Sequence, residues 1–125
     1  MKKLITILSL MMFTFGLLAQ PPEKISYQAV VRNSSNQLVA NQAVGLKISI
    51  LQTSATGTVV YAETLTPSTN ANGLFSISIG TGTVVIGTFS TIDWSKGPYY
   101  IKTEIDPAGG TAYSITATSE LLSVP

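Results

Sequence analysis

The chain has 125 residues, of which seven are Lys or Arg and six are Asp or Glu, and it contains neither histidine nor cysteine. Because Ser-His-Asp and Cys-His arrangements, His-bearing zinc sites and iron facial triads all need an imidazole, these classes of site are excluded. Without cysteine there is no thiol chemistry and no disulfide, so packing and strand pairing must stabilise the fold.

The first twenty residues predict a secretory signal peptide. Lys2 and Lys3 precede an uncharged apolar run over residues 4–18, which is shorter than the roughly 20 residues of a membrane-spanning helix. We expect cleavage near Ala19 or Gln20, followed by release outside the cell or at its surface, with no stable membrane insertion. An uncleaved inner-membrane anchor is the alternative. No cysteine follows the run, which excludes a lipoprotein-type anchor.

The mature part, residues 21–125, is expected to form one domain. Loss of Lys2 and Lys3 leaves five basic against six acidic residues, a net charge of −1. There is no basic stripe for a nucleic acid and no polybasic patch for an acidic membrane. We therefore predict that nucleic acid is not a partner.

Two strands with a period of two open the mature chain. Ile25, Tyr27 and Ala29 alternate with their neighbours until the polar run at residues 33–37. Residues 44–50 alternate in the same way, which predicts one buried side and one solvent-facing side.

Two further strands are predicted at residues 58–66 and 74–79. The inward side of the first is ambiguous, because Glu63 shares a side with Tyr61. The second follows the turn NANG, in which Gly73 can adopt positive φ. Its expected core-facing residues are Phe75, Ile77 and Ile79.

The stretch FSISIGTGTVVIG at residues 75–87 raises the question of a dinucleotide-binding loop. Such a loop needs Gly-x-Gly-x-x-Gly opening a helix, whereas these glycines fall at 80, 82 and 87. The β-branched run at residues 83–86 occupies the place of the helix. The glycines therefore predict the end of one strand and the start of a short edge or linking segment.

The rest of the chain predicts one short helical turn within residues 88–94 and a hairpin. Residues 99–106 alternate cleanly, PAGG at 107–110 forms the loop, and the last strand lies around 113–122. Short strands without helical crossovers indicate an all-β fold, a two-layer antiparallel sandwich of about seven strands.

The acidic residues do not predict a catalytic or metal site. Glu104 and Asp106 share a strand side with Lys102, which is typical of a solvent-facing side rather than of a glycosidase carboxylate pair. Asp93 and Asp106 are isolated carboxylates, far from the repeated acidic spacing of a calcium loop. We predict no catalytic residue, no metal, no cofactor and no enzymatic activity.

Aromatic residues are the candidates for ligand binding. Trp94, Tyr99 and Tyr100 flank the turn SKGP and would stack on surface glycans or anchor a protein partner if exposed. The alternative is that Trp94 plugs the end of the sandwich and only one of the two tyrosines lies outside. We favour the plug, because a sole tryptophan is usually largely buried.

Four blocks together resemble a known family: ISYQAVVRN from Ile25, TVVYAET from Thr58, GTFSTIDWSKGPYYIKTEIDPAGG from Gly87 and TSELLSVP from Thr118. They are similar to an N-terminal β module of secreted and cell-surface proteins of gliding-type Gram-negative bacteria. There it precedes fibre-like, tail-fibre-like or sorting regions. ANQAVGLKISI and TNANGLFSISI more faintly resemble carboxypeptidase regulatory-like domains.

The resemblance implies an immunoglobulin-like or transthyretin-like sandwich and a non-catalytic structural or adhesive spacer at the bacterial surface. Its partners would be other protein segments or subunits, bound by strand addition at an edge such as residues 121–124. Related chains continue past SVP, and the apolar ending at Leu121, Leu122 and Val124 calls for burial or more chain. We therefore expect a truncated chain or an isolated module. A carbohydrate-binding module is the alternative function.

Overall fold

The computed structural model describes residues 24–122, which fold into seven β-strands and two short 3-10 helices. The predicted leader and its cleavage near Ala19 or Gln20 lie outside the described residues. Between residues 24 and 122, no helix has the length and apolar character needed to span a membrane. The strands are β1 Ile25–Val30, β2 Gly45–Gln52, β3 Thr58–Leu65, β4 Leu74–Ile79, β5 Thr83–Ile86, β6 Tyr99–Asp106 and β7 Ile115–Leu121, and the helices are η2 Phe89–Thr91 and η3 Trp94–Lys96.

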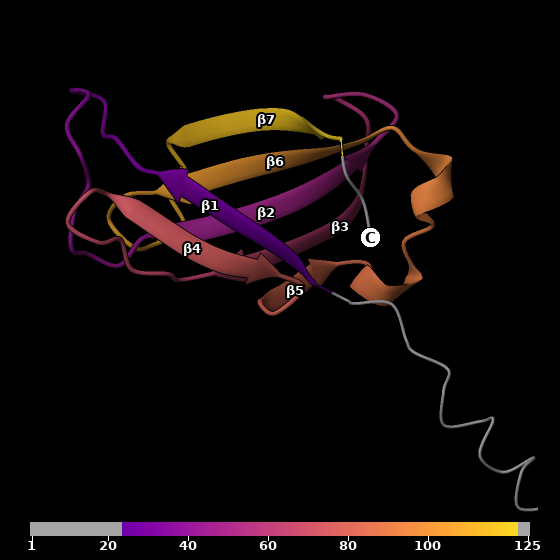
Figure 1. Cartoon of the computed structure of the whole chain (residues 1–125), viewed down its shortest axis with the longest axis horizontal. Helices are drawn as coiled ribbons and strands as arrows, with labels where there is room; N and C mark the ends of the chain where they lie inside the picture. Colours follow the sequence, from indigo (N-terminus) through magenta and orange to yellow (C-terminus); the bar gives the residue numbers. More distant parts are fainter. Residues whose placement is uncertain (1–23, 123–125) are drawn as a thin grey trace, which may run out of the picture.

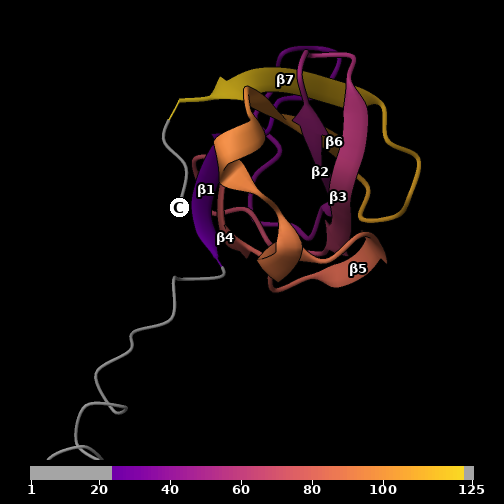
Figure 2. The ribbon, with the colours of Figure 1, turned by 90° about the vertical axis from the view of Figure 1, so that its right-hand side faces the viewer.

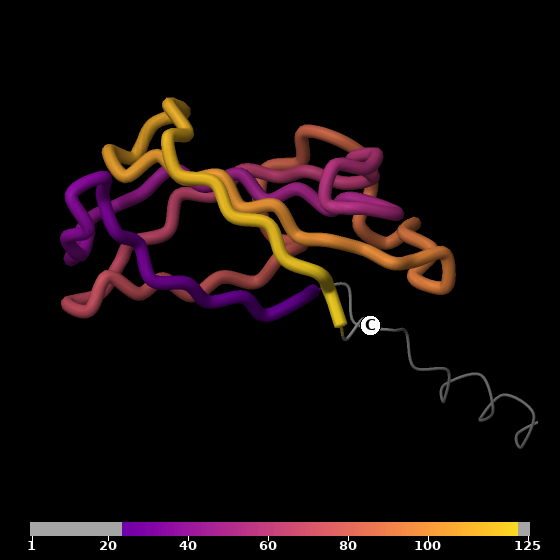
Figure 3. The backbone as a smooth tube through the Cα atoms, turned by 90° about the horizontal axis from the view of Figure 1, so that it is seen from above, coloured from indigo at the N-terminus to yellow at the C-terminus, as the bar shows by residue number. Residues whose placement is uncertain are grey.

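The strands form two antiparallel sheets, which confirms the predicted sandwich. One sheet has five strands in the order β5-β3-β2-β6-β7, and the other has two, β1 and β4. Figure 1 shows β1 and β4 lying across the larger sheet, and Figure 3 shows the two layers from above. All of the strands predicted from the alternating pattern are present.

The core lies between the layers and is centred on β2. Leu46, Ile48 and Ile50 are fully buried on its inward side, as predicted. The predicted solvent-facing side of β2 is only partly exposed at Lys47, and the prediction was wrong for Ser49, which is only 3% exposed. Its neighbours in register are Ala62 of β3 and Lys102 of β6, so this small side chain lies between two flanking strands that shield it from water.

The smaller sheet closes the core from the other side. Phe75 and Ile79 of β4 are buried and Ile77 packs against the core, which confirms their predicted orientation. The ring of Tyr27 on β1 lies 6.2 Å from that of Phe75. Its hydroxyl lies 2.9 Å from Oγ1 of Thr103 on β6, in a hydrogen bond that joins the two sheets.

The larger sheet extends beyond the smaller one at both edges. All four residues of β5 are exposed, and so are the five middle residues of β7. Ala117 and Ser119 of β7 are opposite the buried Thr103 and Ile101, so they share the inward side and yet remain uncovered. The view in Figure 2 shows β7 along the top of the molecule and β5 along its lower edge. The three central strands of the larger sheet are covered, whereas β7 reaches the core only through Ile115 and Leu121 at its two ends.

Candidate functional site

Aromatic rings connect the core to one end of the sandwich. Phe89 of η2 lies 5.3 Å from Tyr61 and 5.8 Å from Trp94, measured between ring centroids, and Trp94 lies 5.1 Å from Tyr99. All three pairs meet edge to face, the arrangement that aromatic quadrupoles favour. Trp94 is partly buried against the core and Tyr99 is only 3% exposed. These rings therefore close the end of the sandwich.

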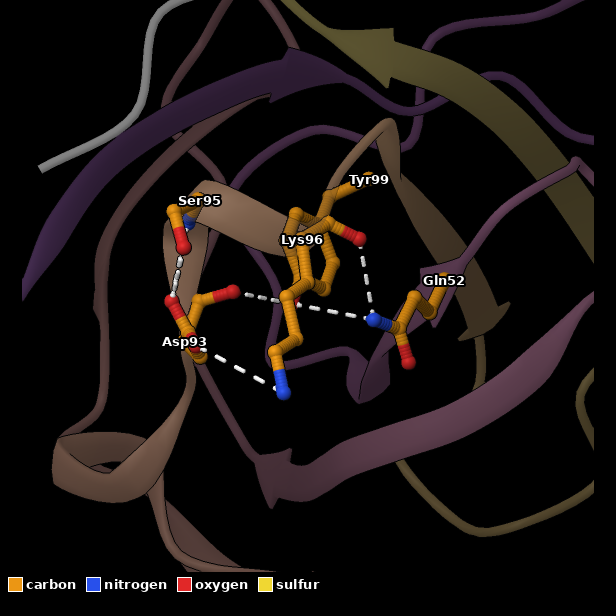
Figure 4. Close-up of polar contacts among 5 residues, drawn as sticks. All are labelled: Gln52, Asp93, Ser95, Lys96 and Tyr99. Carbon is orange, nitrogen blue, oxygen red and sulfur yellow. Dashed lines mark hydrogen bonds and ion pairs between the residues drawn. The ribbon is translucent and has the colours of Figure 1, made fainter.

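Polar groups lock the same end in place (Figure 4). The Asp93 carboxylate caps η3 by accepting the backbone N–H and the hydroxyl of Ser95, and Lys96 Nζ lies 3.9 Å from it. The Ser95 hydroxyl, and then its backbone N–H, lower the pKa of Asp93. Tyr99 donates its hydroxyl to the carbonyl of Asp93, and burial is the main cause of a raised pKa of Tyr99. Gln52 donates its amide to the carbonyl of Lys96.

The three predicted ligand candidates do not share one surface. Trp94 and Tyr99 lie together inside the end of the sandwich, whereas Tyr100 is partly buried on the opposite side of β6, in register with Glu120 and Leu51. This placement matches the plug interpretation of Trp94. A sugar ring would need a face of Trp94 that the neighbouring rings leave free.

The charges of β6 lie as the alternation predicts, with one exception. Lys102 and Glu104 are partly exposed, and Nζ of Lys102 lies 3.9 Å from Oε1 of Glu104. Asp106 was expected on the same solvent-facing side but is buried. Its two carboxylate oxygens accept the backbone N–H groups of Ala108 and Ala112, at 2.9 and 3.1 Å. The β6–β7 loop folds back over Asp106 because these bonds compensate the buried charge.

A second buried carboxylate, Glu63 on β3, is fully inaccessible to solvent. Its Oε1 accepts the backbone N–H of Gly80 at 2.9 Å. Its Oε2 accepts the N–H of Gly82 at 2.9 Å and the hydroxyl of Tyr61 at 2.7 Å. Burial, and then the hydrogen bond to Glu63, raise the pKa of Tyr61. Three donors thus satisfy one buried charge.

The glycine-spaced loop between β4 and β5 therefore binds an anion, and that anion is the chain's own side chain. Gly80 has a φ of +107°, which favours glycine, and a Cβ on Gly82 would lie 2.5 Å from the carbonyl oxygen of Thr64. The sequence analysis noted both partners of this contact but did not predict that they meet. One partner is Glu63, whose inward position was ambiguous, and the other is the pair of glycines that begins 17 residues later.

The two buried carboxylates, Glu63 and Asp106, have a structural role. Within residues 24–122, every buried side-chain nitrogen and oxygen has a hydrogen-bond partner. The same part of the chain has no group of three or more His, Cys, Asp or Glu side chains placed to hold a metal ion. Glu63 fixes the β4–β5 loop to β3, and Asp106 fixes the β6–β7 loop.

The surfaces left for interaction are strand edges. Within the described residues, β5 and β7 each pair on one side only, and so do β1 and β4. Their outer backbone N–H and C=O groups are free to form a ladder with another strand.

The fold is an all-β sandwich in which buried carboxylates hold two loops in place. The outer strands of its sheets have one unpaired edge each in the described part of the chain. The chain belongs to a family described as "Domain of unknown function (DUF8740)", which matches residues 26–120. No curated protein and no solved structure matches the chain.

Proposed function

We propose that the chain is a secreted, non-catalytic structural or adhesive spacer module at the bacterial cell surface, which joins other protein segments by strand addition at its sheet edges. The observation that supports this most is the overhang of the larger sheet. β5 is exposed along its whole length and β7 along its middle five residues, and both lack an outer neighbour in the described part of the chain. An added strand would gain a ladder of backbone hydrogen bonds and would bury side chains on both faces.

The resemblance to N-terminal modules of secreted proteins of gliding-type bacteria supports the location. So does the apolar, lysine-preceded leader, which predicts export. The intact mass of the secreted product tests it. We expect an N-terminus close to Ala19 or Gln20, and a product that retained the leader would contradict secretion in a cleaved form.

The edge at the end of β7 is tested by truncation. Leu121 packs against the core and Leu122 is 87% exposed, so removing residues 121–125 deletes both an anchor and an apolar extension. We expect a lower unfolding midpoint or a loss of assembly with neighbouring segments. A truncated chain with unchanged stability and solution mass would count against a joining role for this edge.

Glycan binding remains the alternative prediction, and one experiment separates it from the spacer role. Glycan-array screening of the mature chain should give no specific ligand if the module is a spacer. A specific glycan that is lost in Trp94→Ala, in a variant that still melts cooperatively, would favour the carbohydrate-binding function instead. Tyr100→Ala is the matched variant for the opposite side of β6.

A further inference from the structure

One end of the smaller sheet exposes a cation among apolar side chains. Val30 and Leu38 are 51% and 42% exposed. Arg32 is exposed as well, follows Val30 by two residues and forms an antiparallel bridge with Leu38. Leu74, which is opposite Val30 on β4, is partly exposed. These four residues are called the Arg32 patch.

The four residues lie on the outward side of the smaller sheet. Residues opposite one another in an antiparallel pair point to the same face, and so do residues two apart along a strand. The burial agrees with this placement, because the adjacent residues Val31 and Val39 are buried in the core. Three apolar side chains therefore share one side with a guanidinium.

Arg32 has no acidic partner within the described residues. Its Nη1 donates to the carbonyl of Asn36 at 3.1 Å, and the ion pairs found between residues 24 and 122 join other side chains. A guanidinium has five N–H donors, so it can still bind a carboxylate through two parallel hydrogen bonds. The patch therefore suits a segment with a carboxylate beside an apolar side chain.

The end of β7 has this composition. Glu120 is exposed and forms no ion pair in the described part of the chain. Leu122, two residues further along, is 87% exposed. Leu121 between them packs against the core, so its two neighbours point away from the core. This end presents a carboxylate and a leucine to the solvent.

The Arg32 patch and the end of β7 lie at opposite ends of the sandwich. Leu121 is in register with Tyr99, at the end that the aromatic rings close. Val30 and Leu74 lie beside the turn at residues 70–73, which is hydrogen-bonded to the segment that precedes β2. Figure 1 shows the arrowhead of β1 at the left and the end of β7 at the right. The two surfaces of one chain therefore do not contact each other.

We propose that the Arg32 patch binds the end of β7 of a second copy of this chain, so that copies join head to tail. With the two segments antiparallel, Arg32 lies opposite Glu120 of the second copy and Val30 lies opposite its Leu122, because both pairs are two residues apart. This proposal rests on the proposed function, since it names the segment that one module joins. The contact uses two different surfaces, so it extends into a row of modules instead of closing as a dimer.

Charge reversal gives the first test, with solution mass measured by light scattering over a range of concentrations of the mature chain. The contact is small, so we expect weak association of the wild type, with a mean mass that rises past that of a dimer and falls as salt is added. Arg32→Glu and Glu120→Arg should each raise the dissociation constant about tenfold, because a like-charge pair replaces an opposite-charge pair.

Mixing the two variants gives the second test. The patch and the β7 end are both acidic in the Arg32→Glu chain and both basic in the Glu120→Arg chain. An equimolar mixture should therefore associate about as strongly as the wild type. Lys47→Glu is the matched control, because it changes the charge equally on a partly exposed residue of β2 and should leave association unchanged. Thermal melts establish that each variant is folded.

A wild-type chain that stays monomeric at every concentration, or a mixture that stays as dissociated as its components, would overturn this proposal. Equal weakening by Lys47→Glu would also overturn it, because it would show a general effect of charge. Failure of the proposed function is a separate result. A monomeric chain whose unfolding midpoint falls on removal of residues 121–125 would leave this end free to join another protein, and monomers that show no effect of truncation would remove both.

Discussion

At the scale of single residues, the most consequential side chain is Glu63. It lies among apolar core residues of β3 and is tolerated there because two backbone amides and one hydroxyl point at its carboxylate. A buried carboxylate without these donors would be costly, so the loop conformation that supplies both amides is the one that stabilises Glu63. The β4–β5 loop is thereby fixed to β3 by a residue that lies in register with Val84, close to the end of the loop.

Replacing Glu63 by Gln should destabilise the fold by about 2–4 kcal/mol. The amide keeps the shape but puts an NH2 group against one of three donors, which leaves a buried donor unsatisfied. The free energy of unfolding from urea titration measures this effect. Glu104→Gln is the matched control, because Glu104 forms only a partly exposed ion pair, for which about 0–1 kcal/mol is expected. Equal losses in the two variants would contradict the structural role of Glu63.

The raised pKa of Tyr61 predicts how the stability of the fold changes with pH in the alkaline range. Burial is the main cause of its raised pKa, followed by the hydrogen bond to Glu63. A pKa above the unfolded value of 10.0 means that the folded state holds the proton longer. The resulting stability is complete below pH 10 and is lost as pH rises further.

Tyr61→Phe should therefore make the alkaline decline shallower. At neutral pH the variant should be less stable by about 1–3 kcal/mol, since Glu63 loses a charge-assisted hydrogen bond. Thermal midpoints between pH 8 and pH 11.5 would show the two curves converging above pH 10. Parallel curves over this range would show that other tyrosines dominate the alkaline transition.

At the scale of elements, the period of two predicted the strands over residues 25–30, 45–52, 74–79 and 99–106, whereas residues 83–86 were predicted only as a short edge or linking segment, from the glycines and the β-branched run. Alternation reports which side of a strand is apolar, so it placed Phe75 and Ile101 correctly. It cannot report what a polar residue meets after folding. Glu63 and Asp106 are buried because loop amides reach them, and that pairing depends on turn geometry rather than on strand periodicity.

Close packing between β2 and the β6–β7 loop gives a prediction at this scale. A Cβ on Gly45 would lie 1.8 Å from the carbonyl oxygen of Gly110, so Gly45→Ala must displace the loop that Asp106 holds. We expect a loss of about 3 kcal/mol in the free energy of unfolding. Gly97→Ala is the control, because its nearest heavy atom, on Tyr99, would lie 3.4 Å away, an ordinary contact. A Gly45→Ala variant as stable as this control would contradict the packing.

At the scale of the whole molecule, the unequal size of the two sheets means that central strands are better protected from local opening than edge strands. β2, β3 and β6 pair on both sides and are covered by β1 and β4 on the inward face. β5 and β7 pair on one side only, and β5 and the middle of β7 are exposed. Opening an edge strand breaks one ladder and exposes little apolar area, so it should require much less free energy than global unfolding. The molecule is therefore expected to open first at its margins.

Native-state hydrogen exchange would test this order of opening, strand by strand. Amides of β2, β3 and β6 should exchange slowest, and those of β5 and β7 fastest, in a dilute sample. The amides of the two edge strands are the least protected because each edge strand is held by one ladder only. Exchange at β5 or β7 as slow as that of β2 would contradict the expected order of opening.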